Sequence, residues 1–97
     1  MQFILTGYDG TDAAALERRM AVRGEHLEKI ELLKKSGEFL FGGAILDEEE
    51  KMIGSVIVYE FPDREALNQK LKEEPYFTKG VWKKIEIHPF RLAKHSH

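Results

Sequence analysis

The feature that most constrains the fold is one long helical run between two short apolar runs. Residues 13–36 begin with three alanines, contain no proline, and are followed by Gly37, a typical C-terminal stop. Thr11 or Asp12 offers a side-chain oxygen to cap the first free amides. Gly24 lies inside this run, where a glycine costs up to about 1 kcal/mol relative to alanine. We interpret it as a kink or a close helix-to-sheet approach; the alternative is that it clears space for a ligand.

His26 lies in the middle of this predicted helix. At 3.6 residues per turn it shares one side with Val22, Ile30 and Leu33, so we expect the imidazole to border the buried face. The adjoining apolar stripe consists of Leu16, Met20 and Leu27.

The remaining elements alternate in type along the chain. A second helix is expected after Asp63, a good N-cap, and before Pro75, with a short connection over 76–80. The expected strands are 2–8, 39–46, 52–61 and 81–90. This order, β-α-β-β-α-β, predicts an α+β ferredoxin-like subunit with a four-stranded antiparallel sheet and both helices on one face. We expect one domain over residues 1–92 and a disordered tail over 93–97, which contains His95 and His97.

The second face of this sheet needs a cover. Three runs, 3–5, 39–41 and 56–59, are apolar on both sides of their strands, whereas a strand with one wet side alternates. With no residues left to cover that face, we expect a homodimer through it.

Composition excludes several classes of function. Fifteen basic and seventeen acidic residues give a formal charge of -2 without a one-signed block, so we expect no nucleic-acid partner. The sequence has no cysteine, which rules out disulfides and thiolate chemistry. No signal segment or long apolar run is present, and we expect a soluble cytoplasmic protein with no membrane partner.

Several short motifs together resemble the YciI-like (YCII-related) family of small dimeric α/β-barrel proteins. They occur in the expected order over residues 1–92. They are the Val22-Arg23-x-x-His26-Leu27 run, Gly42-Gly43, Gly54-Ser55, Pro75-Tyr76, Gly80-Val81 and Pro89-Phe90. The resemblance implies a ferredoxin-like subunit, a face-to-face dimer, and an active site built on a histidine and an aspartate.

The histidine of that site corresponds to His26, and the position of the aspartate is occupied by Glu74. Glutamate keeps the charge but adds a methylene, so its carboxylate either reaches the imidazole in a different geometry or misses it. Relatives carry out dehydrohalogenation or lactone-type chemistry, and many have no assigned activity.

A histidine oriented by a carboxylate is suited to act as a general base, because its unperturbed pKa of about 6.5 lies near neutral pH. We therefore expect His26 and Glu74 as catalytic residues of a lyase or isomerase acting on a small carbonyl or lactone-like molecule without a cofactor. For substrate binding we expect Arg23, Gly42, Ser55 and Tyr76.

Each assignment has an alternative. The same pattern also fits His26 as a packing residue, Arg23 in a salt bridge near Glu25, and Tyr76 with Trp82 at a dimer contact. A metal site would need His26, Glu74 and His88, which lack short ligand spacing, so we expect no metal. At the level of function, the alternatives are a non-catalytic dimeric binding or accessory module, and an oxygenase of the related barrel type.

Overall fold

The computed structural model describes residues 1–93 and confirms the ferredoxin-like α+β fold. Its elements are β1 (Gln2–Asp9), α1 (Ala15–Ser36), β2 (Phe39–Leu46), β3 (Met52–Glu60), α2 (Arg64–Leu71), α3 (Pro75–Thr78) and β4 (Trp82–Phe90). The strands form one antiparallel sheet in the order β2-β3-β1-β4. Residues 94–97, which make up most of the expected tail and include His95 and His97, lie outside the described residues.

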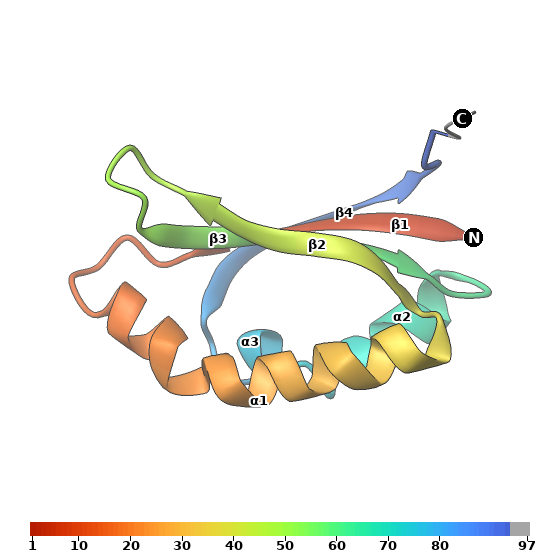
Figure 1. Cartoon of the computed structure of the whole chain (residues 1–97), viewed down its shortest axis with the longest axis horizontal. Coiled ribbons are helices and arrows are strands. Elements are labelled where there is room, and N and C mark those ends of the chain that lie inside the picture. The colour runs from red at the N-terminus through yellow and green to blue at the C-terminus, as the bar shows by residue number, and fades with distance from the viewer. Residues whose placement is uncertain (94–97) are drawn as a thin grey trace.

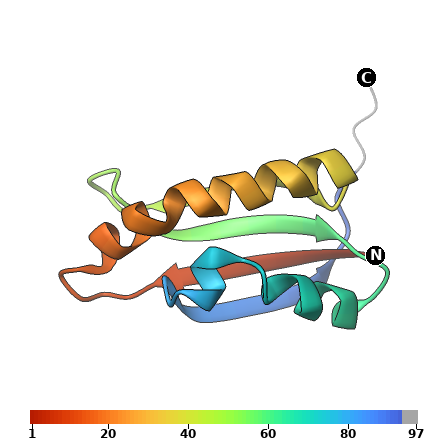
Figure 2. The same cartoon turned by 90° about the horizontal axis from the view of Figure 1, so that it is seen from below.

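All three helices lie on one face of the sheet, as predicted (Figure 1). Seen from the helical side, α1 runs along the half formed by β2 and β3, while α2 and α3 lie over β1 and β4 (Figure 2). Within residues 1–93 the opposite face of the sheet carries no helix (Figure 1). The site described below lies where α1, α3 and the sheet converge.

Alternation along the two central strands builds the core. Phe3 and Leu5 of β1 point toward the helices and are at most 2% exposed, beside Ile57 and Tyr59 of β3. Burial of side chains of this size stabilises the fold by about 1.5–3 kcal/mol each. A slip of one residue would turn this apolar set to the open face, so the burial also fixes the register.

Helix α1 begins later than predicted. Ala14 occupies the N-cap position without a side-chain hydrogen bond, so the expected cap by Thr11 or Asp12 is wrong. The Asp12 carboxylate binds Arg18 instead, with Oδ2 2.8 Å from Nη2. The C-terminal prediction is confirmed, because Gly37 has a φ of +81° and its amide closes the last turn.

The buried face of α1 follows the predicted line through His26, but not the adjoining stripe. Leu16, Met20 and Leu27 are 37%, 49% and 41% exposed. The inward positions are Ala15, Arg19, Val22, His26, Ile30 and Leu33, spaced three or four residues apart. Residues one position later are rotated by about 100°, which turns them from the core.

Gly24 does not mark a close approach of α1 to the sheet. The residue is exposed, and a Cβ built on it would meet nothing within 4 Å among the described residues. The predicted close approach is therefore wrong.

The segment after α2 is more regular than predicted. Residues 75–78 form the short helix α3 where the sequence predicts only a short connection, because Pro75 occupies its first turn, where no amide donor is needed. Glu74 is the N-cap of α3. Asp63 caps α2 as expected, accepting a hydrogen bond from the amide of Ala66 at 2.8 Å.

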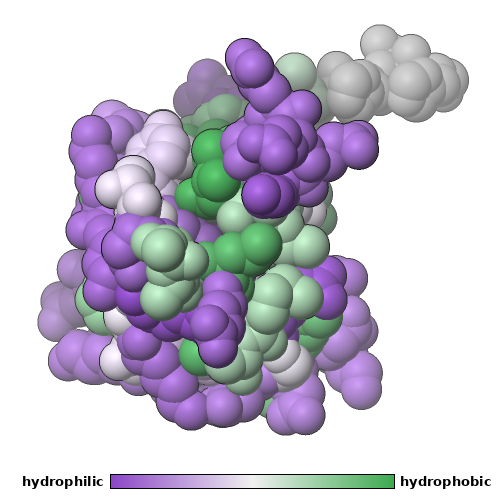
Figure 3. Space-filling view, turned by 90° about the vertical axis from the view of Figure 1, so that its left-hand side faces the viewer, coloured by the Kyte–Doolittle hydropathy of each residue, from purple (hydrophilic) through white to green (hydrophobic). Residues whose placement is uncertain are grey.

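The open face of the sheet is apolar over β1, β2 and β3. Ile4, Val56 and Val58 point to this face, and Phe41 of β2, paired with Val58, is 42% exposed. Apolar atoms also form a band on the end of the molecule that carries the β2–β3 turn (Figure 3). No helix described in residues 1–93 is long and apolar enough to cross a membrane.

Candidate functional site

The centre of the site is a buried pair formed by His26 of α1 and Glu74 at the start of α3. His26 Nδ1 lies 2.6 Å from Glu74 Oε1, and their side chains are 11% and 4% exposed. A carboxylate only accepts hydrogen bonds, so Nδ1 carries the proton and donates it. In the neutral ring, Nε2 then holds the lone pair and is available to a bound molecule.

The added methylene of Glu74 does not prevent this contact. The same Oε1 also accepts a hydrogen bond from the amide of Tyr76 at 3.0 Å, as the N-cap of α3. The same oxygen therefore orients the imidazole and caps α3, the helix that contributes Tyr76 to the site. Two hydrogen bonds to Oε1 reduce the freedom of the carboxylate to move away from His26.

Aromatic rings hold the imidazole on two sides. Tyr76 stacks on His26 with centroids 3.9 Å apart and planes within 10°, and Trp82 meets the ring edge-on at 6.4 Å. Burial raises the pKa of the Tyr76 hydroxyl, and the nearby Arg19 guanidinium only partly offsets this. Both aromatic residues are buried within the subunit.

A second polar cluster, which the sequence analysis missed, lies beside this pair. Arg19 Nη1 donates to both carboxylate oxygens of Asp9 at 3.0 and 3.1 Å, and its Nη2 donates to Ser55 Oγ at 2.8 Å. Trp82 Nε1 donates to the same Ser55 oxygen at 3.2 Å. The serine oxygen accepts twice, which leaves its own proton to donate to a ligand.

The Arg19 guanidinium also lies 4.6 Å above the Tyr76 ring, and its Nε has no hydrogen-bond partner within residues 1–93. Burial raises the pKa of the Asp9 carboxyl, against the opposing effect of the Arg19 charge. The sequence held one signal for this cluster. Arg19 precedes His26 by seven residues, which is two helical turns and therefore the same face.

These groups border a cavity of about 170 Å³ between α1 and the sheet. All of the predicted substrate-binding residues line it: Arg23, Gly42, Ser55 and Tyr76, together with His26 and Arg19. Arg23 is half-buried there, while Glu25 pairs with Lys79 at 2.7 Å instead. Gly42 has a packing role, since a Cβ would lie 2.6 Å from the carbonyl oxygen of Val56.

The residues weighed for a metal site do not meet. His88 of β4 pairs with Ile4 of β1 and points to the open face of the sheet, whereas its neighbour Ile87 packs against the core on the helical face. The sheet therefore separates His88 from His26 and Glu74. Within residues 1–93 no group of three or more His, Asp or Glu side chains is placed to hold a metal ion.

Comparison with known proteins identifies the family to which the chain is related. The sequence model of the YCII-related domain matches residues 1–91. Protein YciI of Escherichia coli O6:H1 is 29% identical over 97 residues, covering 94% of this chain and 97% of that protein. An uncharacterized protein of Haemophilus influenzae is 32% identical over 82 residues, covering 78% of this chain and 84% of its own length.

Two solved structures share the fold. The 5-chloro-2-hydroxyhydroquinone dehydrochlorinase of Burkholderia phenoliruptrix AC1100, in complex with 2,5-dihydroxybenzoquinone, is similar with a TM-score of 0.82, 20% identity and full coverage of both chains. An antibiotic biosynthesis monooxygenase is similar with a TM-score of 0.54 and 18% identity, covering 96% of this chain and 98% of that one.

Proposed function

Since the chain belongs to the YCII-related family, we propose that it is a small cofactor-independent enzyme of lyase or isomerase type, with His26 as general base. The observation that carries the proposal is the 2.6 Å contact between His26 Nδ1 and Glu74 Oε1. It fixes the tautomer and leaves Nε2 as the basic nitrogen of a residue that lines the cavity.

The proposed step is removal of a proton from the carbon next to a carbonyl group. His26 Nε2 takes the proton, and the electron pair of the C–H bond forms an enolate. The imidazolium that results is stabilised by the Glu74 carboxylate on its other nitrogen. In a lyase the enolate then expels a leaving group with its electron pair, and in an isomerase it is reprotonated at another carbon.

The cationic side of the cavity suits the developing negative charge. Arg23 and Arg19 line the same cavity as His26, and Ser55 retains a proton to donate. Charged and hydroxyl donors fixed beside an enolate oxygen stabilise it most effectively in a site shielded from water. Arg19 is already held by Asp9, so Arg23 is the more available partner for an anionic substrate group.

We take a small cyclic carbonyl compound as the substrate class. The cavity volume of about 170 Å³ suits a single ring with a few oxygen substituents. The dehydrochlorinase with the same fold is complexed with 2,5-dihydroxybenzoquinone, a molecule of this kind. Hydroxylated quinones and small lactones are therefore the first compounds to screen.

A homodimer through the open sheet face is part of the proposal. The exposed Phe41 and the half-buried Ile4 and Val56 lie together on that face. A second copy would bury this surface with matching chemistry on both sides, as a two-fold interface requires.

Proton exchange in heavy water tests the base without knowledge of the full reaction. The protein is incubated with cyclic ketones, hydroxyquinones and lactones, and NMR follows deuterium uptake next to the carbonyl. We expect uptake with at least one compound class, and a loss of about 100-fold or more in His26→Gln. His88→Gln is the matched control, since His88 lies on the other face of the sheet.

Exchange that persists in His26→Gln would remove the imidazole from the mechanism. Saturable binding of these compounds without exchange or product would instead support a binding module. The spacing of His26 and Glu74 is equally compatible with holding a ligand, so this second function is decided by the same experiment.

A further inference from the structure

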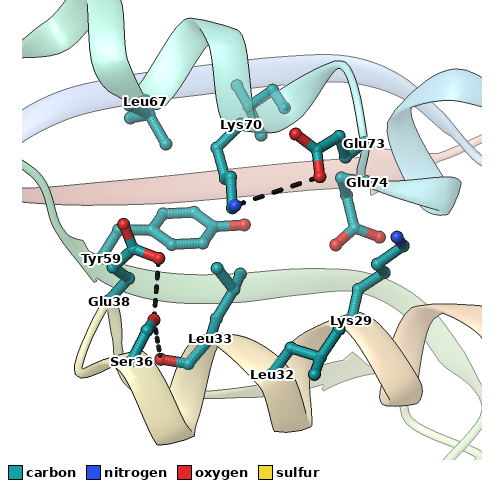
Figure 4. Close-up of a pocket in the computed structure, with 11 residues that line it drawn as sticks. Lys29, Leu32, Leu33, Ser36, Glu38, Tyr59, Leu67, Lys70, Glu73 and Glu74 are labelled. Carbon is teal, nitrogen blue, oxygen red and sulfur yellow. Dashed lines mark hydrogen bonds and ion pairs between the residues drawn. The ribbon is translucent and has the colours of Figure 1, made fainter.

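A second cavity lies on the far side of Glu74 from His26. It has a volume of about 120 Å³ and is bordered by α1, β3, α2 and the segment before α3 (Figure 4). Its apolar lining comes mainly from Leu32, Leu33, Leu67 and Leu71. An engineered cavity of about 150 Å³ with a leucine-rich lining holds benzene, so this one matches a molecule of one small ring.

The second carboxylate oxygen of Glu74 is unused. Oε1 makes both contacts, to His26 Nδ1 and to the amide of Tyr76, whereas Oε2 has no hydrogen-bond partner within residues 1–93. Glu74 is only 4% exposed and lines this cavity. A buried acceptor without a donor destabilises the protein, and a ligand with one donor would satisfy it.

The other polar groups select the charge of that ligand. The Tyr59 hydroxyl points toward the Glu74 carboxylate across the cavity, and burial keeps Tyr59 protonated by raising its pKa (Figure 4). Lys29 and Lys70 also border the cavity, with Lys70 paired to Glu73 at 4.0 Å. Glu38 and Glu73 also border the cavity and balance the two lysines, so Glu74 requires a hydrogen-bond donor and the leucine lining favours a neutral one.

We propose that this cavity binds a small neutral phenol or alcohol, whose hydroxyl donates to Glu74 Oε2 while its ring packs among the four leucines. The hydroxyl oxygen in turn accepts from Tyr59. Glu74 contacts His26 through its other oxygen, so a molecule bound at Oε2 should change the NMR signals of the imidazole. The binding site stands apart from the cavity of the proposed reaction and does not depend on turnover.

Phenol and toluene are the probes, because they have nearly the same shape and differ in one hydroxyl. Two-dimensional NMR of the isotope-labelled full chain follows the amides and methyls of Leu67 and Leu71, and the His26 ring. We expect phenol to saturate these signals at concentrations about tenfold or more below toluene, as one hydrogen bond to a buried charge provides. Only phenol is expected to shift the His26 ring signals.

Two variants keep the test decisive. Tyr59→Phe removes one hydroxyl and should reduce the preference for phenol while leaving toluene binding unchanged, with Tyr8→Phe as the matched control on β1. Leu71→Phe fills the cavity and should abolish both. Equal affinity for the two probes, no saturable binding, or shifts confined to residues around Arg23 and Gly42 would each overturn the proposal. None of these outcomes bears on deuterium exchange by His26.

Discussion

Glu74 uses one carboxylate oxygen for two tasks, orienting His26 and capping α3. The cap contributes about 0.5–2 kcal/mol to stability in typical helices, so the residue would be retained for structure alone. Its position next to Pro75 explains how both tasks combine. Proline fixes the start of α3, and the residue before it is held in an extended conformation that points its side chain at α1.

Replacement of Glu74 tests whether its carboxylate sets the tautomer of His26. Glu74→Gln keeps an acceptor oxygen for Nδ1, and we expect the ring to retain its proton there. Glu74→Met removes both acceptors, so the Nδ1–H tautomer should lose its dominance and stability should fall by about 1 kcal/mol. Ring nitrogen-15 shifts of His26 report the tautomer. A Glu74→Met protein that keeps Nδ1–H would show that another group orients the imidazole.

Tyr59 makes the stability sensitive to alkaline pH. Burial raises its pKa above the usual value, and the Glu74 carboxylate adds to the effect. The unfolded chain loses this proton near pH 10 while the folded chain keeps it, so ΔG of unfolding falls as pH rises above that value. The slope from one proton is up to about 1.4 kcal/mol per pH unit.

We expect Tyr59→Phe to flatten this alkaline loss of stability in urea unfolding between pH 9 and pH 11. Tyr8→Phe, which changes an exposed tyrosine, should leave the slope as in the wild type. Parallel curves for all three proteins would mean that the Tyr59 proton plays no part in the alkaline transition.

At the level of elements, two glycines show how closely strands and helices approach. A Cβ on Gly7 of β1 would lie 2.6 Å from the Trp82 ring, which packs across the strand into the site. Gly24 of α1 has free space around it. Glycine is therefore required for packing at position 7, whereas at position 24 it only lowers the stability of the helix.

The same substitution should act in opposite directions at these positions. Gly7→Ala forces Trp82 to shift and should destabilise the protein by about 1–3 kcal/mol. Gly24→Ala removes backbone freedom from the unfolded chain and should stabilise it by about 0.5–1 kcal/mol. Urea denaturation measures both, and a destabilising Gly24→Ala would indicate a partner packed on that part of α1.

At the scale of the whole molecule, the sheet has one face covered by helices and one apolar open face (Figure 1). A stable interface needs about 1,000 Å² or more of buried surface. The open side of a four-stranded sheet offers an area of this order. The exposed Phe41 remains in water there unless another chain covers it.

We expect analytical ultracentrifugation to show a dimer that Phe41→Glu converts to a monomer at the same concentration, since two charges would meet in an apolar contact. Leu32→Glu, at a more exposed position on the helical side, should remain dimeric. A wild-type chain that sediments as a monomer at micromolar concentration would contradict the proposed interface.

Much of this architecture was predictable because its signals are local. The order of strands and helices follows from hydrophobic periodicity, and the ends at Gly37 and Asp63 follow from backbone conformation and capping within a few residues. The same periodicity placed His26 inward, and the resemblance to the YCII-related family pointed to Glu74 as its partner without deciding whether the longer side chain reaches it.

Tertiary structure alone decided the contacts between elements. The pairing of Arg19 with Asp9 and Ser55 joins α1 to β1 and β3, and no periodicity encodes which charges meet across them. The rotation of α1 that exposes Leu16 and Met20 depends on contacts between α1 and the sheet, because Arg19 of α1 binds polar residues there. The 2.6 Å contact of Glu74 with His26, and the second cavity that Glu74 lines, also depend on how α3 packs against the rest of the fold. That packing results from many contacts between residues far apart in the sequence. Local sequence determined the elements and their order, and long-range packing determined the site.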